Sequence, residues 1–137
     1  MSAARWLVKS EPHTYSFDHL VRDGRTVWDG VRNNTAALHL KAMRQDDEVL
    51  FYHSNVGMAV VGIARVAWEA FPDPSDPANR FVAVELSAVR ALTSPVTLAE
   101  IKATPALAEM AMLRQGRLSV SPVSAAEWET ILRLAGG

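Results

Sequence analysis

The stretch 27–34, VWDGVRNN, places a large aromatic side chain beside groups that hydrogen-bond in fixed geometry. Trp28 offers a broad ring face, and Gly30 lets a backbone or a ligand approach closely. Arg32 and Asn33 add donors with planar geometry. This set suits a flat, polar, partly anionic molecule. The simpler interpretation is that Trp28 packs in the core, the Asp-Gly pair forms a turn and Asn33 caps a helix.

A second stretch, FYHSN at 51–55, again joins an aromatic ring to polar side chains. Trp28 and Tyr52, with Phe81 or Trp6 as further candidates, provide flat faces on which a base stacks, worth about 1 to 3 kcal/mol per base. Three cations could neutralise a phosphate, namely Lys9, Arg32 and Arg117. Five polar side chains could read the edge of a base, namely Ser10, Asn33, His53, Ser54 and Ser119. Such a pocket takes a base that is flipped out of a helix or bound single-stranded.

Length and composition limit the classes of protein to which this chain can belong. The 137 residues suit one domain, and 49% hydrophobic and 21% charged residues are ordinary for a soluble globular chain. The absence of cysteine excludes disulfides, thiolate metal sites and cysteine nucleophiles. The longest apolar run, near 58–64, is far shorter than the roughly 20 residues of a membrane-spanning helix. The N-terminal apolar patch is too short for a secretory signal. We therefore expect a cytoplasmic protein without membrane contact.

The charge is nearly neutral but uneven. Residues 1–45 hold seven Lys and Arg against four Asp and Glu, a balance of +3, whereas residues 46–137 hold seven against eleven, a balance of −4. This distribution permits a basic face in the first third of the chain. A duplex binder that relies on many phosphate contacts would carry more positive charge.

Recognisable catalytic motifs are absent from the sequence. It contains no GxSxG, no glycine-rich phosphate loop and no GxGxxG, and its four histidines lack the spacing of zinc ligands. We expect no metal, no cofactor and no catalytic residue. Two alternatives stay open at this point. One is an enzyme acting on a modified nucleotide or nucleic acid with Glu11 and His53 as acid and base; the other is a protein-interaction module with a vestigial pocket.

Hydrophobic periodicity and capping residues predict the elements that position these side chains. Strands are predicted at 5–9, 48–53, 58–68 with a bend at Gly62, and 80–89, with extended structure at 116–121. Helices are predicted at 16–21, 35–43, 97–103, 105–113 and 125–134. The expected N-caps are Ser16, Asn33 or Asn34, Thr97 and Ser124. The segment 71–79 carries three prolines and is expected to be a surface loop.

The predicted strands cluster in the middle of the chain and do not alternate strictly with helices. We therefore expect an α+β fold rather than a doubly wound sheet. A small mixed or antiparallel barrel capped by helices fits the number of strands, since closure removes exposed edges.

Several longer motifs occur in order along the chain, namely WLVKSEP at 6–12, YS at 15–16, WDGVRN at 28–33, FYHSN at 51–55, VVGIARV at 60–66, FPDP at 71–74, PVTLAEIK at 95–102 and RLSVSPVSAAEW at 117–128. Together they resemble the EVE domain family of the PUA-like superfamily. The match covers essentially the whole chain. It implies a single EVE domain over residues 1–137, built as a PUA-like small mixed β-barrel surrounded by short helices.

The resemblance also implies a function and a site. The function is non-enzymatic recognition of a modified base, in the first place a modified cytosine such as 5-methylcytosine, flipped from DNA or RNA into an aromatic pocket. The residues that match the family's pocket motifs are Lys9, Ser10, Glu11, Trp28, Gly30, Val31, Arg32, Asn33, Tyr52, His53, Ser54, Arg117, Leu118 and Ser119. Trp28 would form one wall, with Tyr52 or His53 as the opposing or edge contact. We expect a monomer, with modified DNA or RNA as the partner and an effector protein as a further candidate.

Overall fold

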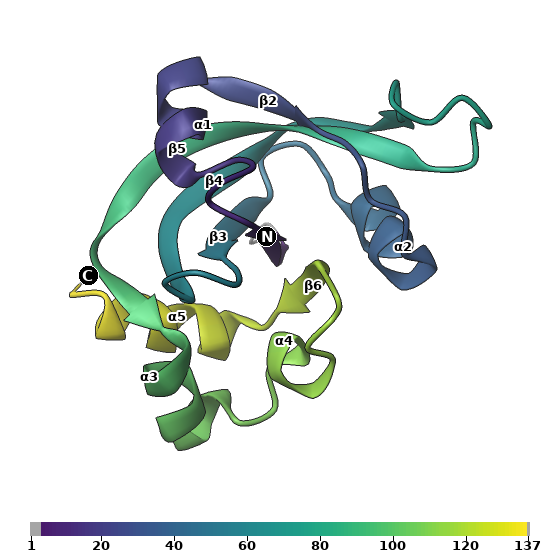
Figure 1. The fold of residues 1–137 in the computed structure, drawn as a ribbon. Helices are drawn as coiled ribbons and strands as arrows, with labels where there is room; N and C mark the ends of the chain where they lie inside the picture. The colour runs from purple at the N-terminus through teal and green to yellow at the C-terminus, as the bar shows by residue number, and fades with distance from the viewer. Residues whose placement is uncertain (1–3, 137) are drawn as a thin grey trace.

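The computed structural model describes residues 4–136, which form one curved six-stranded sheet with short helices packed on it (Figure 1). Residues 1–3 and 137 of the expected domain lie outside the described residues. The strands are β1 (Arg5–Ser10), β2 (Arg25–Trp28), β3 (Glu48–His53), β4 (Ala59–Pro72), β5 (Val82–Thr97) and β6 (Val120–Val123). Their order in the sheet is β2-β5-β4-β3-β1-β6. The pair β1–β3 is parallel and the other pairs are antiparallel.

The expected α+β class with a mixed sheet is confirmed, but hydrogen bonds do not close the sheet. Within residues 4–136, β2 and β6 are its two edges. The long strands β4 and β5 carry several shifts of register, one of them between Val60 and Gly62, and they sweep from one end of the molecule to the other (Figure 1). This agrees with the predicted bend at Gly62, because a bulge bends a strand and increases its twist. In Figure 1, β2 lies near the top of the view and β6 in its lower part.

The helices are α1 (Phe17–Asp23), α2 (Asn34–Ala42), α3 (Leu98–Ala103), α4 (Ala111–Arg114) and α5 (Ala125–Leu134), with a short 3-10 helix at Pro105–Leu107. Among residues 4–136, four of the five α-helices begin within one residue of the predicted start, and α4 is the exception. The side chains of Ser16, Thr97 and Ser124 each accept a hydrogen bond from the backbone three residues on, within a reciprocal capping box. Asn33 caps α2 in the same way, without the reciprocal bond.

Two cores lie on the two faces of the sheet, and β3 serves both. Val49 and Phe51 belong to the core that contains residues of α1 and α2, whereas Leu50 and Tyr52 belong to the core that contains residues of α3 and α5. Successive side chains of a strand point to opposite faces, so this division follows from the period of two.

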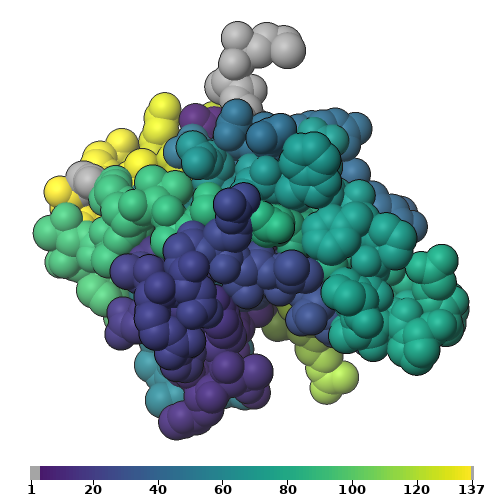
Figure 2. Space-filling view, turned by 90° about the horizontal axis from the view of Figure 1, so that it is seen from above, coloured from purple at the N-terminus to yellow at the C-terminus, as the bar shows by residue number. Residues whose placement is uncertain are grey.

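The space-filling view shows the purple and dark-blue surface of α1 and β2 between green β5 and the teal segment that leads from β4 to β5 (Figure 2).

Three predicted elements differ from the structure. Strand β2 was not predicted, because its four residues are held extended by pairing with β5 rather than by a pattern of their own. Strand β5 continues to Thr97, well beyond the predicted end at 89. The helix predicted at 105–113 is wrong, because the backbone is extended at Met110, and the buried side chains of Leu107 and Met110 both reach the second core. Among residues 4–136, no helix is long and apolar enough to cross a membrane.

We predict that Gly62→Ala destabilises the fold. A Cβ at this position would lie 2.4 Å from Cζ of the buried Phe17 ring, so α1 or β4 must shift. Overpacking of this kind costs about 1 to 3 kcal/mol in the free energy of unfolding, measurable by urea titration. The control is Gly116→Ala, whose Cβ would meet no atom within 4 Å. Equal urea midpoints for the two variants would contradict the close packing of Phe17 on Gly62.

Candidate functional site

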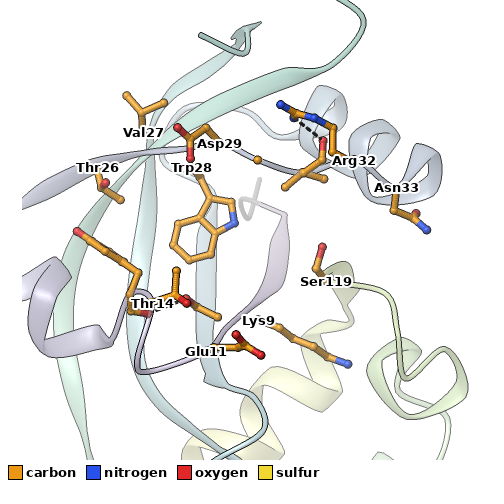
Figure 3. A pocket seen from close by; sticks show the side chains of 14 residues that line it. Lys9, Glu11, Thr14, Thr26, Val27, Trp28, Asp29, Arg32, Asn33 and Ser119 are labelled. Carbon is orange, nitrogen blue, oxygen red and sulfur yellow. Dashed lines mark hydrogen bonds between the residues drawn. The ribbon is translucent and has the colours of Figure 1, made fainter. Parts of the chain in front are cut away.

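A pocket of about 740 Å³ lies where the ends of β1 and β2 approach the residue that precedes β6. The indole of Trp28 projects into the middle of the view, with Lys9 and Glu11 on one side and Ser119 on another (Figure 3). The pocket therefore lies between the end of β1, the strand β2 with the segment that follows it, and Ser119. The predicted site residues that line it are Lys9, Ser10, Glu11, Trp28, Gly30, Val31, Arg32, Asn33 and Ser119.

Trp28 is both a core residue and a pocket wall. Its side chain is 9% exposed and belongs to the core cluster around Phe51. The Phe51 ring lies 5.5 Å from the indole at an interplanar angle of 82°, and the Tyr15 ring lies 6.3 Å away at 80°. Such T-shaped contacts hold the indole in one orientation. Trp28 therefore packs in the core, as the simpler interpretation expected, and it also lines the pocket.

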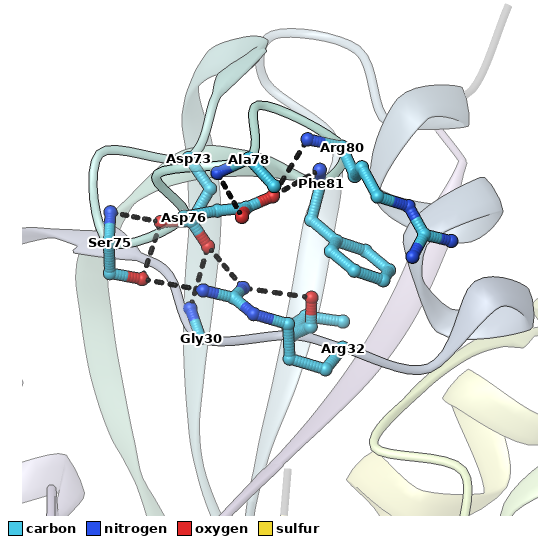
Figure 4. Close-up of polar contacts among 9 residues, drawn as sticks. Gly30, Arg32, Asp73, Ser75, Asp76, Ala78, Arg80 and Phe81 are labelled. Atoms are coloured by element: carbon cyan, nitrogen blue, oxygen red, sulfur yellow. Dashed lines mark hydrogen bonds and ion pairs between the residues drawn. The ribbon is translucent and has the colours of Figure 1, made fainter.

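A buried carboxylate fixes the pocket wall that follows Trp28. Asp73, directly after β4, accepts hydrogen bonds from the backbone N–H of Gly30 at 2.8 Å and from Nη1 of Arg32 at 2.9 Å (Figure 4). Its other oxygen accepts bonds from the backbone N–H and the hydroxyl of Ser75, both at 2.7 Å. Gly30 has φ +78°, a conformation that glycine adopts without strain. The proline-rich loop thus sets the shape of the segment 29–33.

The electrostatics of Asp73 follow from these contacts. Burial by itself would raise the pKa of this carboxyl, but the hydrogen bonds from Ser75, Arg32 and Gly30 outweigh burial and lower the pKa from 3.8 to about 2. The guanidinium of Arg32 also contacts the Ser75 hydroxyl at 3.1 Å and lies 5.3 Å from the centre of the Phe81 ring. Arg32, expected as a phosphate contact, is therefore held by the protein itself.

Other predicted polar residues of the pocket also have partners within the chain. Nζ of Lys9 donates to the carbonyl of Gly116 at 2.8 Å, and burial lowers the pKa of Lys9. The hydroxyl of Ser10 donates to the carbonyl of Tyr15 at 2.6 Å. Oδ1 of Asn33 accepts from the N–H that it caps, and its amide nitrogen stays available as a donor.

Five predicted residues do not line this pocket. Tyr52 and Ser54 line a cavity of about 250 Å³, and Arg117 and Leu118 line another of about 260 Å³. His53 lines none of these three cavities. Its Nε2 accepts a hydrogen bond from the N–H of Phe17 at 3.1 Å, and burial lowers its pKa although Asp18 opposes the shift. Tyr52 points away because it follows Phe51 on the strand and faces the second core.

Five residues of the pocket lining were not predicted. They are Thr14, Tyr15, Thr26, Val27 and Asp29. Tyr15 and Asp29 were within reach of sequence reasoning, since each lies beside a predicted motif. Thr26 and Val27 depend on β2, the strand that the sequence did not reveal. No group of three or more His, Asp or Glu side chains suited to a metal ion occurs among residues 4–136.

We predict that Asp73→Asn destabilises the protein more at neutral than at acid pH. Because the folded-state pKa lies below the ordinary value of 3.8, the ionised carboxylate stabilises the fold above about pH 4, and this contribution disappears as the pH falls towards 2. The difference between the native protein and the variant should shrink by about 2 kcal/mol between pH 7 and pH 2. Urea unfolding at both pH values measures it. Glu129→Gln, at an exposed position of α5, is the control, and the same loss at both pH values for Asp73→Asn would refute the prediction.

Comparison with known proteins places the chain in a family. The EVE domain matches residues 4–134. Thymocyte nuclear protein 1 of Rattus norvegicus is 32% identical over 94% of this chain and 72% of its own length. A protein of Rhodopseudomonas palustris solved by NMR is 49% identical, with a TM-score of 0.92 over 97% of this chain and 93% of that one. Human THYN1, in a crystal structure with DNA that contains 5-methylcytosine, is 29% identical, with a TM-score of 0.91 over 98% and 99% of the two chains. The protein described here belongs to the EVE domain family.

Proposed function

We propose that this chain binds nucleic acid and holds a modified base, flipped out of its strand, in the pocket beside Trp28 without changing it chemically. The observation that carries the proposal is the pocket itself, about 740 Å³ in volume, with an oriented indole in its wall. This volume lies within the range typical of small-molecule sites, about 300 to 1,000 Å³. The human relative solved with 5-methylcytosine DNA supports a modified cytosine as the first candidate.

The aromatic surroundings of Trp28 favour a flat ligand. The contacts with Tyr15 and Phe51 are both T-shaped, so neither ring lies parallel to the indole. A base that stacks on the indole in a parallel arrangement would gain about 1 to 3 kcal/mol. The same two contacts prevent the indole from turning, so little side-chain entropy is lost when the base binds.

The polar groups of the pocket favour a base that carries an amino group. Glu11 and Asp29 bring carboxylates, which accept hydrogen bonds from the exocyclic amine of cytosine. The amide nitrogen of Asn33 can donate to a carbonyl oxygen of the same base. Thymine and uracil present a carbonyl where cytosine presents its amine, so the carboxylates disfavour them.

Recognition through the pocket also fits the charge of the chain. The net charge is −1, and Arg32, which lines the pocket, is paired with Asp73. Binding that depends on the base rather than on many phosphates should weaken only modestly as salt rises. The proposed partner is thus modified DNA or RNA, recognised by its base. Cytoplasmic location, a monomeric state and an effector partner stay predictions.

The enzyme alternative requires Glu11 and His53 to act together. Glu11 lines the pocket, but His53 does not, and Nε2 of His53 already accepts the N–H of Phe17. These positions favour binding over turnover. Mass spectrometry of modified oligonucleotides after long incubation with the protein tests the enzyme alternative. Any chemically altered base would establish an enzyme.

We predict that removing the indole weakens binding of the modified base. Fluorescence anisotropy is measured with matched oligonucleotides that carry cytosine, 5-methylcytosine or 5-hydroxymethylcytosine. Trp28→Leu, which keeps apolar volume in the core, should weaken binding of the preferred oligonucleotide about 5- to 150-fold, as the loss of one stacking contact implies.

The control for this experiment is Trp68→Ala. Trp68 is 58% exposed on β4 and does not line the pocket, so its removal should leave the affinity unchanged. Circular dichroism and urea unfolding establish that both variants are folded. Equal affinity for all three bases, unaffected by Trp28→Leu, would overturn the proposed function.

A further inference from the structure

A second cavity adjoins the pocket on the far side of Lys9. It has a volume of about 250 Å³, and the residues that line it include Lys9, Tyr52, Asn55, Met58, Leu98 and Lys102. Lys9 lines both cavities. The amide of Asn55, on this side, donates to the carboxylate of Glu11, on the other. Lys9 and the contact between Asn55 and Glu11 therefore lie between the two cavities.

The ammonium of Lys9 faces this second cavity. Its Nζ lies 5.8 Å from the centre of the Tyr52 ring and donates one hydrogen bond, to the carbonyl of Gly116. Tyr52 and Gly116 line the second cavity but not the pocket of Trp28. An ammonium group has three donors, so two are left for an anion. Within residues 4–136, Lys9 forms no ion pair with a carboxylate.

A second cation and an apolar wall complete the cavity. Lys102 on α3 is exposed, and among the described ion pairs none involves it. Met58 is 45% exposed, and together with Leu98 it gives the cavity an apolar surface. Two ammonium groups beside an apolar wall are complementary to a molecule with a phosphate at one end and a flat ring at the other. A nucleotide has this composition.

We propose that this Lys9–Lys102 cavity binds the nucleotide adjacent to the flipped base on the same strand, with the connecting phosphate held between the two lysines. The proposal rests on the proposed function of the Trp28 pocket. Because Lys9 borders both spaces, a strand that delivers its base to the first reaches the second within one nucleotide. The site thus reads a modified base together with its neighbour, and the neighbour's ring packs on Met58 and Leu98.

The test compares a ligand without a neighbour with one that has neighbours. The probes are 5-methyldeoxycytidine as a free nucleoside and a single-stranded trinucleotide with 5-methylcytosine in the centre, titrated by NMR. Lys102→Glu should weaken the trinucleotide about tenfold and leave nucleoside binding within about twofold. It should also reduce the slope of log K against log salt by about 0.7, as expected when one single-strand phosphate contact is lost. Met58→Asp, on the apolar wall, should weaken the trinucleotide and spare the nucleoside.

The control is Lys41→Ala, which changes an exposed lysine of α2 that lines none of the three cavities described above. It should behave as the native protein does in the salt titration. Arg117→Ala tests the competing path of the strand, through the neighbouring cavity of about 260 Å³ that shares Gly116 with this one. Dinucleotides with the neighbour on the 5′ or the 3′ side then show which neighbour is bound.

The outcomes separate the two proposals. If Trp28→Leu weakens both probes but Lys102→Glu weakens neither, the Trp28 pocket stands and the second cavity is not a nucleotide site. If Arg117→Ala weakens the trinucleotide and Lys102→Glu does not, the strand leaves on the other side and the inference is overturned. If neither probe binds, the proposed function fails and this inference fails with it.

Discussion

The hydrogen bonds of Asp73 tie together two parts of the chain that are more than 40 residues apart, and the shape of the pocket depends on them. The carboxylate holds the N–H of Gly30 on one oxygen and Ser75 on the other. A buried carboxylate without partners would be costly, so the loop that carries Asp73 and the segment that follows β2 stabilise each other. The same oxygen of Asp73 accepts the hydrogen bond from Gly30 and neutralises the charge of Arg32.

The pocket and the first core are parts of one packed unit. The Phe51 ring contacts both Phe17 and Trp28, at 5.4 and 5.5 Å between ring centres, and Phe17 in turn lies against Gly62. Packed aromatic rings therefore connect the bend of β4 with the pocket wall. In the proposed function, this packing would hold the wall in one position, as discrimination between bases that differ by a small substituent requires.

The three cavities described above adjoin one another, because each pair of them shares a lining residue. Asn33 borders the pocket of Trp28 and the cavity of Arg117, and Gly116 borders that cavity and the cavity of Lys102. Lys9 donates to the carbonyl of Gly116, so the segment around Gly116 and β1 hold each other in place. Residues far apart in the sequence thus line three adjoining cavities, and in the proposed function a base and its neighbours would occupy this surface.

Local signals in the sequence were sufficient for most elements. Ser16, Thr97 and Ser124 cap helices as predicted, because a cap depends on a hydrogen bond to a residue three positions away. Strand β3 was predicted with its observed ends from a run of β-forming residues. Strand β2 was missed because only its partner β5 makes it extended. The helix predicted at 105–113 is interrupted because the backbone at Met110 is not helical, and the side chain of Met110 is buried in the second core.

The sequence by itself determined the family, the class of fold and the part of the pocket that lies within continuous motifs, from Lys9 to Glu11 and from Trp28 to Asn33. Those residues are neighbours along the chain, so their chemistry can be read without knowing how the chain folds. Only the tertiary structure decided that Tyr15 rather than Tyr52 contacts Trp28, that Arg32 is neutralised by Asp73, and that Tyr52 faces another cavity. These outcomes depend on which face a strand presents and on contacts across more than 40 residues, and neither is encoded in local spacing.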